Sequence, residues 1–324
     1  QRLQGVLPTL PDIVSPGGVR TCRIVGVPAR QGASGVNRIE AESGSVPENI
    51  ENALRAHVQR EETAADLGEK RIDSLWDHLL RTAGIAEQLG RAEGIDPAAC
   101  RLAALFHDAG KFHQGRRHGG SVPEEQHSVE ILESLAERYC VPEHLVAEIS
   151  EAILQLYRGD PDPTPLAKVL FDADNLDKLG YLGAANFFVK RGLRGRGISP
   201  EFMVQFTVEL TYARHAVGCM QTEAGQDWAR RRAPQTRSFF TSLLDQLRED
   251  GLADFVITEL DFDGLLIDAV VPASCSCGRA LAPEIRQEEG IKCRKIHLVH
   301  ACYDCDERYE ARFCRPRLVG EEED

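Results

Sequence analysis

Long hydrophobic runs are missing from this sequence. No stretch of its 324 residues approaches the roughly 18 to 20 consecutive apolar residues that a membrane-spanning helix requires. The first ten residues, QRLQGVLPTL, also lack the basic start and the apolar centre of a secretory signal. These two absences favour a cytoplasmic protein that has no membrane partner.

Positive charge is also scarce. The chain has 38 Lys and Arg residues against 51 Asp and Glu residues, and its formal net charge is −13. Proteins that bind a nucleic-acid backbone use clustered Lys and Arg to neutralise the phosphates. Nucleic acid is therefore not expected as the main ligand, although a local basic patch remains open.

Sequence patterning divides the chain into three parts. Residues 1–46 are rich in Gly, Pro and Ser and show no helical period, so we expect an irregular N-terminal segment. Residues 47–252 carry helical periods separated by Gly and Pro, and about seven helices are expected between residues 71 and 250. Residues 253–324 begin with two alternating runs joined by DFDG, which predict a β-hairpin ahead of a cysteine-rich end. The predicted fold is mainly α, with a helical bundle followed by a small β domain.

Polar residues border the apolar faces of two expected helices. His78 lies beside the apolar face of the amphipathic helix expected over residues 73–90. His107 and Asp108 follow the apolar run LAALF, and Gly110 is placed to end that helix. Polar and charged groups are costly to bury without a partner, so this doublet needs a partner in the fold.

A third segment, residues 165–188, brings further acids to an apolar stripe. On a helical wheel Asp174 falls at the edge of the stripe and Asp177 falls inside it, whereas Asp172 and Lys178 are expected to face solvent. One divalent ion would satisfy the buried acids and imidazoles together, with the four ligands His78, His107, Asp108 and Asp174. Imidazole nitrogen and carboxylate oxygen suit Mn, Fe, Co, Ni, Zn or Mg, and ligands from separate helices can converge in a bundle core.

The ordered ligand set resembles the pattern H...HD...D of the HD superfamily of metal-dependent phosphohydrolases. The segments HLLRTAGIA, AALFHDAGKF and DADNLDKLGYLG are similar to the three ligand motifs of that superfamily, and TEAGQDWARRRAPQTRSFFTSLLDQL is similar to its closing helices. The resemblance covers about residues 70–250. It implies an enzyme that hydrolyses a phosphate ester, namely a phosphomonoester, a nucleotide or a phosphodiester. A small, phosphorylated and nucleotide-like substrate is expected, and a homo-oligomer is left open.

The resemblance also implies roles for single residues. Members with the motif HD-x-x-K bind substrate phosphate through the lysine, which corresponds to Lys111, and Arg81 is expected to offset substrate charge beside it. Asp108 is expected to accept a proton as well as to bind the metal, and Asp177 to orient a ligand or a water. The metal is expected to activate a water for attack on phosphorus.

The remaining histidines predict the number of catalytic metals. Members with a second metal carry extra histidines, and His127 corresponds to one of them. Gln155 and Leu156 occupy the place where such members have histidine. We therefore expect one catalytic metal and leave His127 as a second-metal or substrate contact.

Six of the ten cysteines lie in the last fifty residues, a density that favours metal ligation over a disulfide framework in an intracellular chain. The pairs in CSCG and CYDC stand on either side of a predicted hairpin, as in zinc ribbons. They predict a structural zinc site with the ligands Cys275, Cys277, Cys302 and Cys305. The first pair has one intervening residue where ribbons have two, so other ligands stay open: Cys293, Cys314, His297 and His300. An iron–sulfur cluster also stays open.

Two other functions are compatible with the sequence. An HD-type di-iron oxygenase would require the additional histidines that this chain lacks at residues 155 and 156. A catalytically inactive HD scaffold could instead act through its zinc module as a nucleic-acid or protein binding factor.

Overall fold

The computed structural model describes residues 48–65, 75–115, 122–158, 161–193, 195, 197–290 and 293–319. The irregular segment predicted for residues 1–46 lies outside this part of the chain. Residues 43–324 form one compact unit. Among the described residues, no helix combines the length and the apolar character that crossing a membrane requires.

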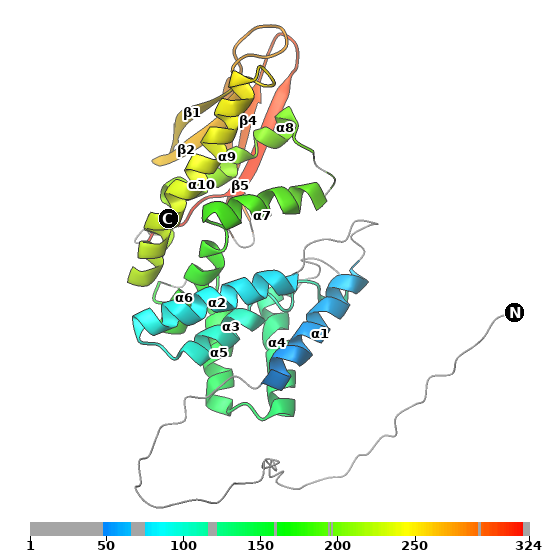
Figure 1. Cartoon of the computed structure of the whole chain (residues 1–324), viewed down its shortest axis with the longest axis vertical. Coiled ribbons are helices and arrows are strands. Elements are labelled where there is room, and N and C mark those ends of the chain that lie inside the picture. The colour runs from blue at the N-terminus through cyan, green and yellow to red at the C-terminus, as the bar shows by residue number, and fades with distance from the viewer. Residues whose placement is uncertain are drawn as a thin grey trace, which may run out of the picture. The chain divides into compact units, whose positions relative to one another are not determined.

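Helices make up most of the described chain before residue 250 (Figure 1). They are α1 (Glu48–Ala64), α2 (Leu75–Glu93), α3 (Pro97–Phe106), the 3-10 turn η1 (His113–Gly115), α4 (Glu124–Tyr139), α5 (Glu143–Gln155), α6 (Pro165–Leu176), α7 (Gly180–Leu193), α8 (Pro200–Met203), α9 (Phe206–Cys219) and α10 (Glu223–Glu249). The expectation of about seven helices between residues 71 and 250 is too low, because α2 to α10 all lie in that range. The segment 165–188 is two helices, and Gly180, with a φ of +79°, makes the break between them.

Strands follow the helices and form two small antiparallel sheets. β1 (Phe255–Phe262) pairs with β2 (Leu265–Pro272), while β3 (Ala282–Glu289), β4 (Arg294–Ala301) and β5 (Arg308–Cys314) form a sheet in that order. Asp263 and Gly264 adopt positive φ values of 49° and 76°, as a two-residue hairpin turn requires. The prediction of a mainly α fold with a small C-terminal sheet region is confirmed.

Helix α6 lies at the centre of the helical core. Helices α2, α3, α5 and α10 all contact it, and residues 166–177 are buried except for the partly buried Lys168. The polar side chains of α6 are therefore buried along with its apolar ones, and its aspartates lie inside the core.

Asp172 is the clearest case. Its wheel position predicts a solvated side chain, but Asp172 is fully buried. Its carboxylate accepts hydrogen bonds from the backbone N–H of Gln221 (2.8 Å), the N–H of Thr222 (2.9 Å) and the hydroxyl of Thr222 (2.7 Å). A Cβ at Gly225 would lie only 2.1 Å from this carboxylate, so glycine is needed there. Burial raises the pKa of Asp172 to about 6, although these hydrogen bonds oppose the shift. Asp172 thus holds the start of α10 against α6.

Apolar side chains join the helices to the strands. Phe206 of α9, Phe240 of α10, Phe255 of β1 and Val270 of β2 belong to one buried cluster. The domain boundary predicted at residue 252 falls between α10 and β1 and stays a prediction.

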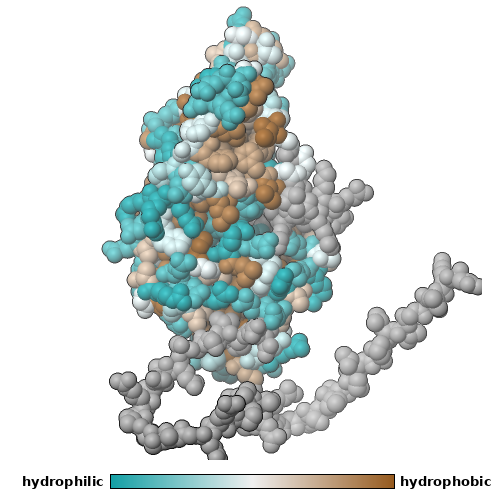
Figure 2. Space-filling view, viewed as in Figure 1, coloured by the Kyte–Doolittle hydropathy of each residue, from teal (hydrophilic) through white to brown (hydrophobic). Residues whose placement is uncertain are grey.

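The face shown in Figure 2 mixes hydrophilic residues with hydrophobic patches, and the larger patches lie in its upper half.

Replacing Asp172 tests this junction. The variant Asp172→Ala is expected to lower the free energy of unfolding by about 2 to 4 kcal/mol, because three donors lose a buried acceptor. Urea denaturation measures the change. The control Asp162→Ala removes a carboxylate whose side chain is 94% exposed and should cost less than about 0.5 kcal/mol. Equal losses in the two variants would show that the Asp172 hydrogen bonds do not stabilise the fold.

Candidate functional site

Four side chains converge where α2, the end of α3 and α6 meet. The Nε2 atom of His78 lies 3.4 Å from Oδ1 of Asp174 and 3.8 Å from Oδ2 of Asp108. The Nε2 atom of His107 lies 3.9 Å and 3.8 Å from the same two oxygens. His78, His107 and Asp174 form a group that could hold a metal ion, and Asp108 lies beside this group with Oδ2 3.8 Å from both imidazole nitrogens.

His107 has a ring nitrogen that requires a partner. Its Nδ1–H donates to the carbonyl of Ala104 at 2.7 Å, so Nε2 carries a lone pair when the ring is neutral. Burial lowers the pKa of His107, even though Asp108 and Asp174 oppose the shift, and this keeps the ring neutral. Nε2 is buried and has no hydrogen-bond partner among the described residues. A lone pair that faces two carboxylates can be satisfied by a cation.

The two carboxylates are ionised. Burial alone would favour the neutral acids, but Lys111 lowers the pKa of Asp108, and Lys178 lowers that of Asp174 well below its ordinary value. The cluster thus offers two nitrogen and two oxygen donors. Bonds of about 2.0 to 2.2 Å to one ion place neighbouring donors roughly 3.0 to 3.4 Å apart, a few tenths of an ångström less than the separations found here. The residues therefore fit a single divalent ion.

The other nitrogen of His78 is fixed by a carboxylate. Its Nδ1–H donates to Oδ2 of Asp177 at 2.9 Å, and Arg81 binds the same carboxylate through Nε (2.7 Å) and Nη2 (2.9 Å). Burial would raise the pKa of Asp177, but His78 and Arg81 outweigh burial and lower it to about 2. This ion pair turns Nε2 of His78 toward Asp108 and Asp174.

Lys111, Lys178 and Tyr157 lie on the outer side of the two acids. Lys111 donates to Oδ2 of Asp108, and Lys178 donates to Oδ2 of Asp174 at 3.0 Å. The hydroxyl of Tyr157 donates to the same oxygen of Asp174. The side chain of Lys178 is 43% exposed, as its wheel position predicts, although its ammonium group reaches Asp174. Tyr157 was not predicted, because it follows α5 with a positive φ of 63° that no local pattern indicates.

Ser128 of α4 holds the doublet in place. Its hydroxyl donates to the carbonyl of His107 at 3.0 Å and accepts from the N–H of Gly110 at 2.9 Å. The sequence predicts that Gly110 ends this helix, but α3 ends earlier, at Phe106. A Cβ at Gly110 would lie 2.4 Å from the carbonyl oxygen of Glu124, so glycine permits the close approach of α4.

His127 contacts residues other than the four converging side chains. Its ring stacks on His113 with the ring centroids 3.7 Å apart, and its Nδ1 lies 3.1 Å from Glu130. Among the described residues, the histidine and acid group able to hold an ion contains His78, His107 and Asp174, and neither Asp108 nor His127 belongs to it.

The second cysteine-rich site also comes together. Cys275 and Cys277 precede β3, and Cys302 and Cys305 lie in the turn between β4 and β5. The Sγ atom of Cys275 lies 2.8 Å from Cys277, 3.4 Å from Cys302 and 3.8 Å from Cys305. A zinc ion with tetrahedral thiolate ligands requires separations of roughly 3.8 Å. These four sulfurs could hold one metal ion.

The alternative cysteine ligands are occupied elsewhere. Cys293 and Cys314 form a disulfide that joins the residue before β4 to the last residue of β5. The Nε2 atom of His297 lies 3.3 Å from Oε2 of Glu310 on the neighbouring strand β5. Neither His297 nor His300 belongs to the cysteine group found among the described residues.

A cavity of about 500 Å³ lies beside the histidine and aspartate cluster, where Tyr157, Asp177 and Lys178 line it. Its volume is within the range of small-molecule sites.

Comparison with protein families identifies the segment that carries this cluster. Residues 75–179 match the family model described as HD domain, from the start of α2 to the residue before α7. Residues 75–179 are an HD domain. All four converging side chains lie within the HD domain, and so do Arg81, Lys111 and Asp177.

Solved structures similar to this chain include proteins from several bacteria. Bacillus subtilis YpgQ is 22% identical over 61% of this chain and 96% of its own, with a TM-score of 0.46. YpgQ in complex with ADP is 24% identical over 62% and 95% of the two chains, with a TM-score of 0.43. A predicted HD superfamily hydrolase from an uncultured Thermotogales bacterium is 21% identical over 62% and 92%, with a TM-score of 0.41. No curated protein matches the chain.

The hydrogen bond between His78 and Asp177 can be tested by metal binding. The variant Asp177→Asn should weaken Mn²⁺ affinity about 10- to 100-fold, because His78 loses the carboxylate that sets its orientation. Competition titration against a fluorescent chelator measures the affinity. Asp77→Asn, which neutralises an exposed acid next to His78 in sequence, should leave it unchanged. Unchanged affinity in Asp177→Asn would argue against a metal at His78.

The cysteine group predicts a second, separate ion. The variant Cys302→Ser should contain one zinc fewer per chain than the wild type, because one of four tetrahedral ligands is removed. Elemental analysis of the purified proteins measures the content. Cys219→Ala removes a buried cysteine that lies outside the group and serves as the control. Equal zinc in all three proteins would rule out these cysteines as ligands.

Proposed function

We propose that the protein is a metal-dependent phosphohydrolase that cleaves a phosphate ester of a small molecule. One divalent ion would be held by His78, His107, Asp108 and Asp174. The observation that carries the proposal is the Nε2 atom of His107, a buried lone-pair nitrogen that faces two ionised carboxylates and has no hydrogen-bond partner in the part of the chain that the structure describes. The fold of an HD domain supports the same reaction class.

The chemistry that a divalent ion supplies when bound is polarisation of a phosphoryl oxygen and a lowered pKa of a coordinated water. The residues of the chain would orient and neutralise the substrate around it. Asp108 would accept the proton of the attacking water, since its Oδ2 atom lies 3.8 Å from the Nε2 atoms of both histidines of the cluster. The donors Lys111, Lys178 and Tyr157 would bind phosphate oxygens, because all three already lie against acceptor oxygens at this point.

Arg81 has a positioning role in this proposal. The family resemblance predicts that Arg81 offsets substrate charge, but its Nε and Nη2 atoms bind Asp177. Asp177 in turn binds His78. Arg81 would therefore act on the reaction by holding His78 in place.

Activity measurements test the proposal. The wild type should release inorganic phosphate from at least one ester in a panel assayed with Mn²⁺, Co²⁺, Ni²⁺ or Mg²⁺, and chelation should abolish the release. Asp108→Asn should lower kcat/KM at least about 100-fold, because it removes both a ligand and a proton acceptor. Asp77→Asn should match the wild type. Undiminished activity in Asp108→Asn, or turnover that survives chelation, would overturn the proposed function.

A further inference from the structure

The far wall of the 500 Å³ cavity comes from the C-terminal end of the described chain. Cys293, Phe313 and residues 314–317 line it opposite Tyr157 and Lys178, which belong to the HD domain side. The cysteine-rich part of the chain therefore contributes directly to the space beside the histidine and aspartate cluster.

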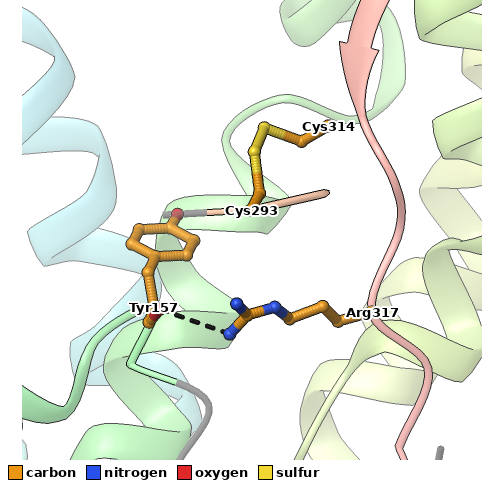
Figure 3. The surroundings of a disulfide bond; sticks show 4 residues. All are labelled: Tyr157, Cys293, Cys314 and Arg317. Carbon is orange, nitrogen blue, oxygen red and sulfur yellow. Dashed lines mark hydrogen bonds between the residues drawn. A yellow bond between two sulfur atoms is a disulfide. The ribbon is translucent and has the colours of Figure 1, made fainter. Parts of the chain in front are cut away.

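Several contacts fix this wall in place. The disulfide between Cys293 and Cys314 ties the chain before β4 to the end of β5, and the N–H of Arg315 donates to the carbonyl of Arg294 at 2.7 Å. Figure 3 shows the disulfide and Arg317 beside Tyr157, with Arg317 donating to the carbonyl of Tyr157 at 3.2 Å. Arg315 lines the cavity, and its Nη2 atom donates to the carbonyl of Asp263 at 3.1 Å, so both its backbone and one nitrogen of its guanidinium are held in place.

Positive charge dominates the lining. Five cationic side chains line the cavity, namely Lys178, Lys190, Arg191, Arg315 and Arg317. Three carboxylates line it as well, namely Glu124, Asp177 and Glu209. Arg81 offsets Asp177, while Lys178 is paired with Asp174 and leaves four cations for a second anion. Burial raises the pKa of Glu209 to about 7, although the neighbouring cations oppose the shift, so Glu209 is partly neutral at pH 7. The lining therefore favours an anion that extends beyond the metal cluster.

A hydroxyl group in the same lining also lacks a hydrogen-bond acceptor among the described residues. The hydroxyl of Tyr212, on α9, is buried and has no hydrogen-bond partner among the described residues. Burial raises the pKa of Tyr212 well above its ordinary value, so the hydroxyl keeps its proton and can donate. Leaving such a group unsatisfied is unfavourable, and an anionic oxygen in the cavity would satisfy it.

We propose that the cavity binds a substrate with a second anionic group, and that Arg315 and Tyr212 recognise that group. The substrate class is then a phosphate ester that carries a further phosphate or carboxylate, with the first phosphate at the metal cluster. This inference rests on the proposed function for the role of the first phosphate. Arg315 and Tyr212 determine specificity and lie outside the set of metal ligands.

Non-hydrolysable ligands separate this inference from catalysis. Full-length protein loaded with Mn²⁺ is titrated calorimetrically with alkane bisphosphonates of two to six carbons and with alkyl monophosphonates of matching length. At least one bisphosphonate should bind about tenfold more tightly than its monophosphonate, since its second phosphonate gains charge-assisted hydrogen bonds that the monophosphonate cannot make. Equal affinity of both ligand types at every length would overturn the inference.

Variants assign the preference to the two residues. Arg315→Gln and Tyr212→Phe should each reduce bisphosphonate affinity about fivefold or more and leave monophosphonate affinity unchanged. Arg312→Gln, at a position on β5 three residues before Arg315 that is 69% exposed and absent from the cavity lining, should behave as the wild type. A preference that survives both cavity variants would assign the anion elsewhere and contradict the inference.

Phosphate release from esters is measured in parallel with the wild type. A bisphosphonate preference without hydrolysis of any ester would support the anion site and contradict the proposed function. Hydrolysis without that preference would support the function and contradict the second anion site.

Discussion

Two ionised carboxylates in the middle of a helical core set the main constraint on this protein. Asp108 and Asp174 keep their charge against burial because cations and imidazoles surround them. Isolated charges are costly to bury, so the helices that carry them must bring compensating groups to the same point. The helices α2, α3 and α6 place these groups at one point, and Gly110 lets α4 pack closely beside them.

The support of the cluster extends outward in steps. Asp177 and Arg81 orient His78, and Ser128 holds the backbone at His107. Farther out, Arg317 reaches the carbonyl of Tyr157, whose hydroxyl binds Asp174. A residue from the C-terminal segment thus contacts the loop that supplies a donor to the HD domain cluster. The cysteine-rich end contributes to the shape and charge of the neighbouring cavity in addition to forming its own candidate metal site.

Periodicity and spacing were sufficient to predict the converging side chains. His78 and Asp174 lie at the edges of apolar faces that a 3.6-residue period defines, and the cysteine pairs are short local motifs. The remaining residues depend on tertiary contacts. Asp172 is buried because the start of α10, fifty residues later, packs on it, and Tyr157 reaches Asp174 from an irregular turn. The pairing of Cys293 with Cys314 is one of many that ten cysteines allow, so spacing alone could not select it.

Crystallography with manganese tests the central claim most directly. Anomalous diffraction collected above and below the manganese absorption edge, from crystals of the whole chain grown with MnCl₂, locates the ion without any assumption about activity. The account predicts a single strong peak within about 2.0 to 2.3 Å of Nε2 of His78, Nε2 of His107 and one oxygen each of Asp108 and Asp174. A manganese peak bound elsewhere, with none at this cluster, would contradict the account.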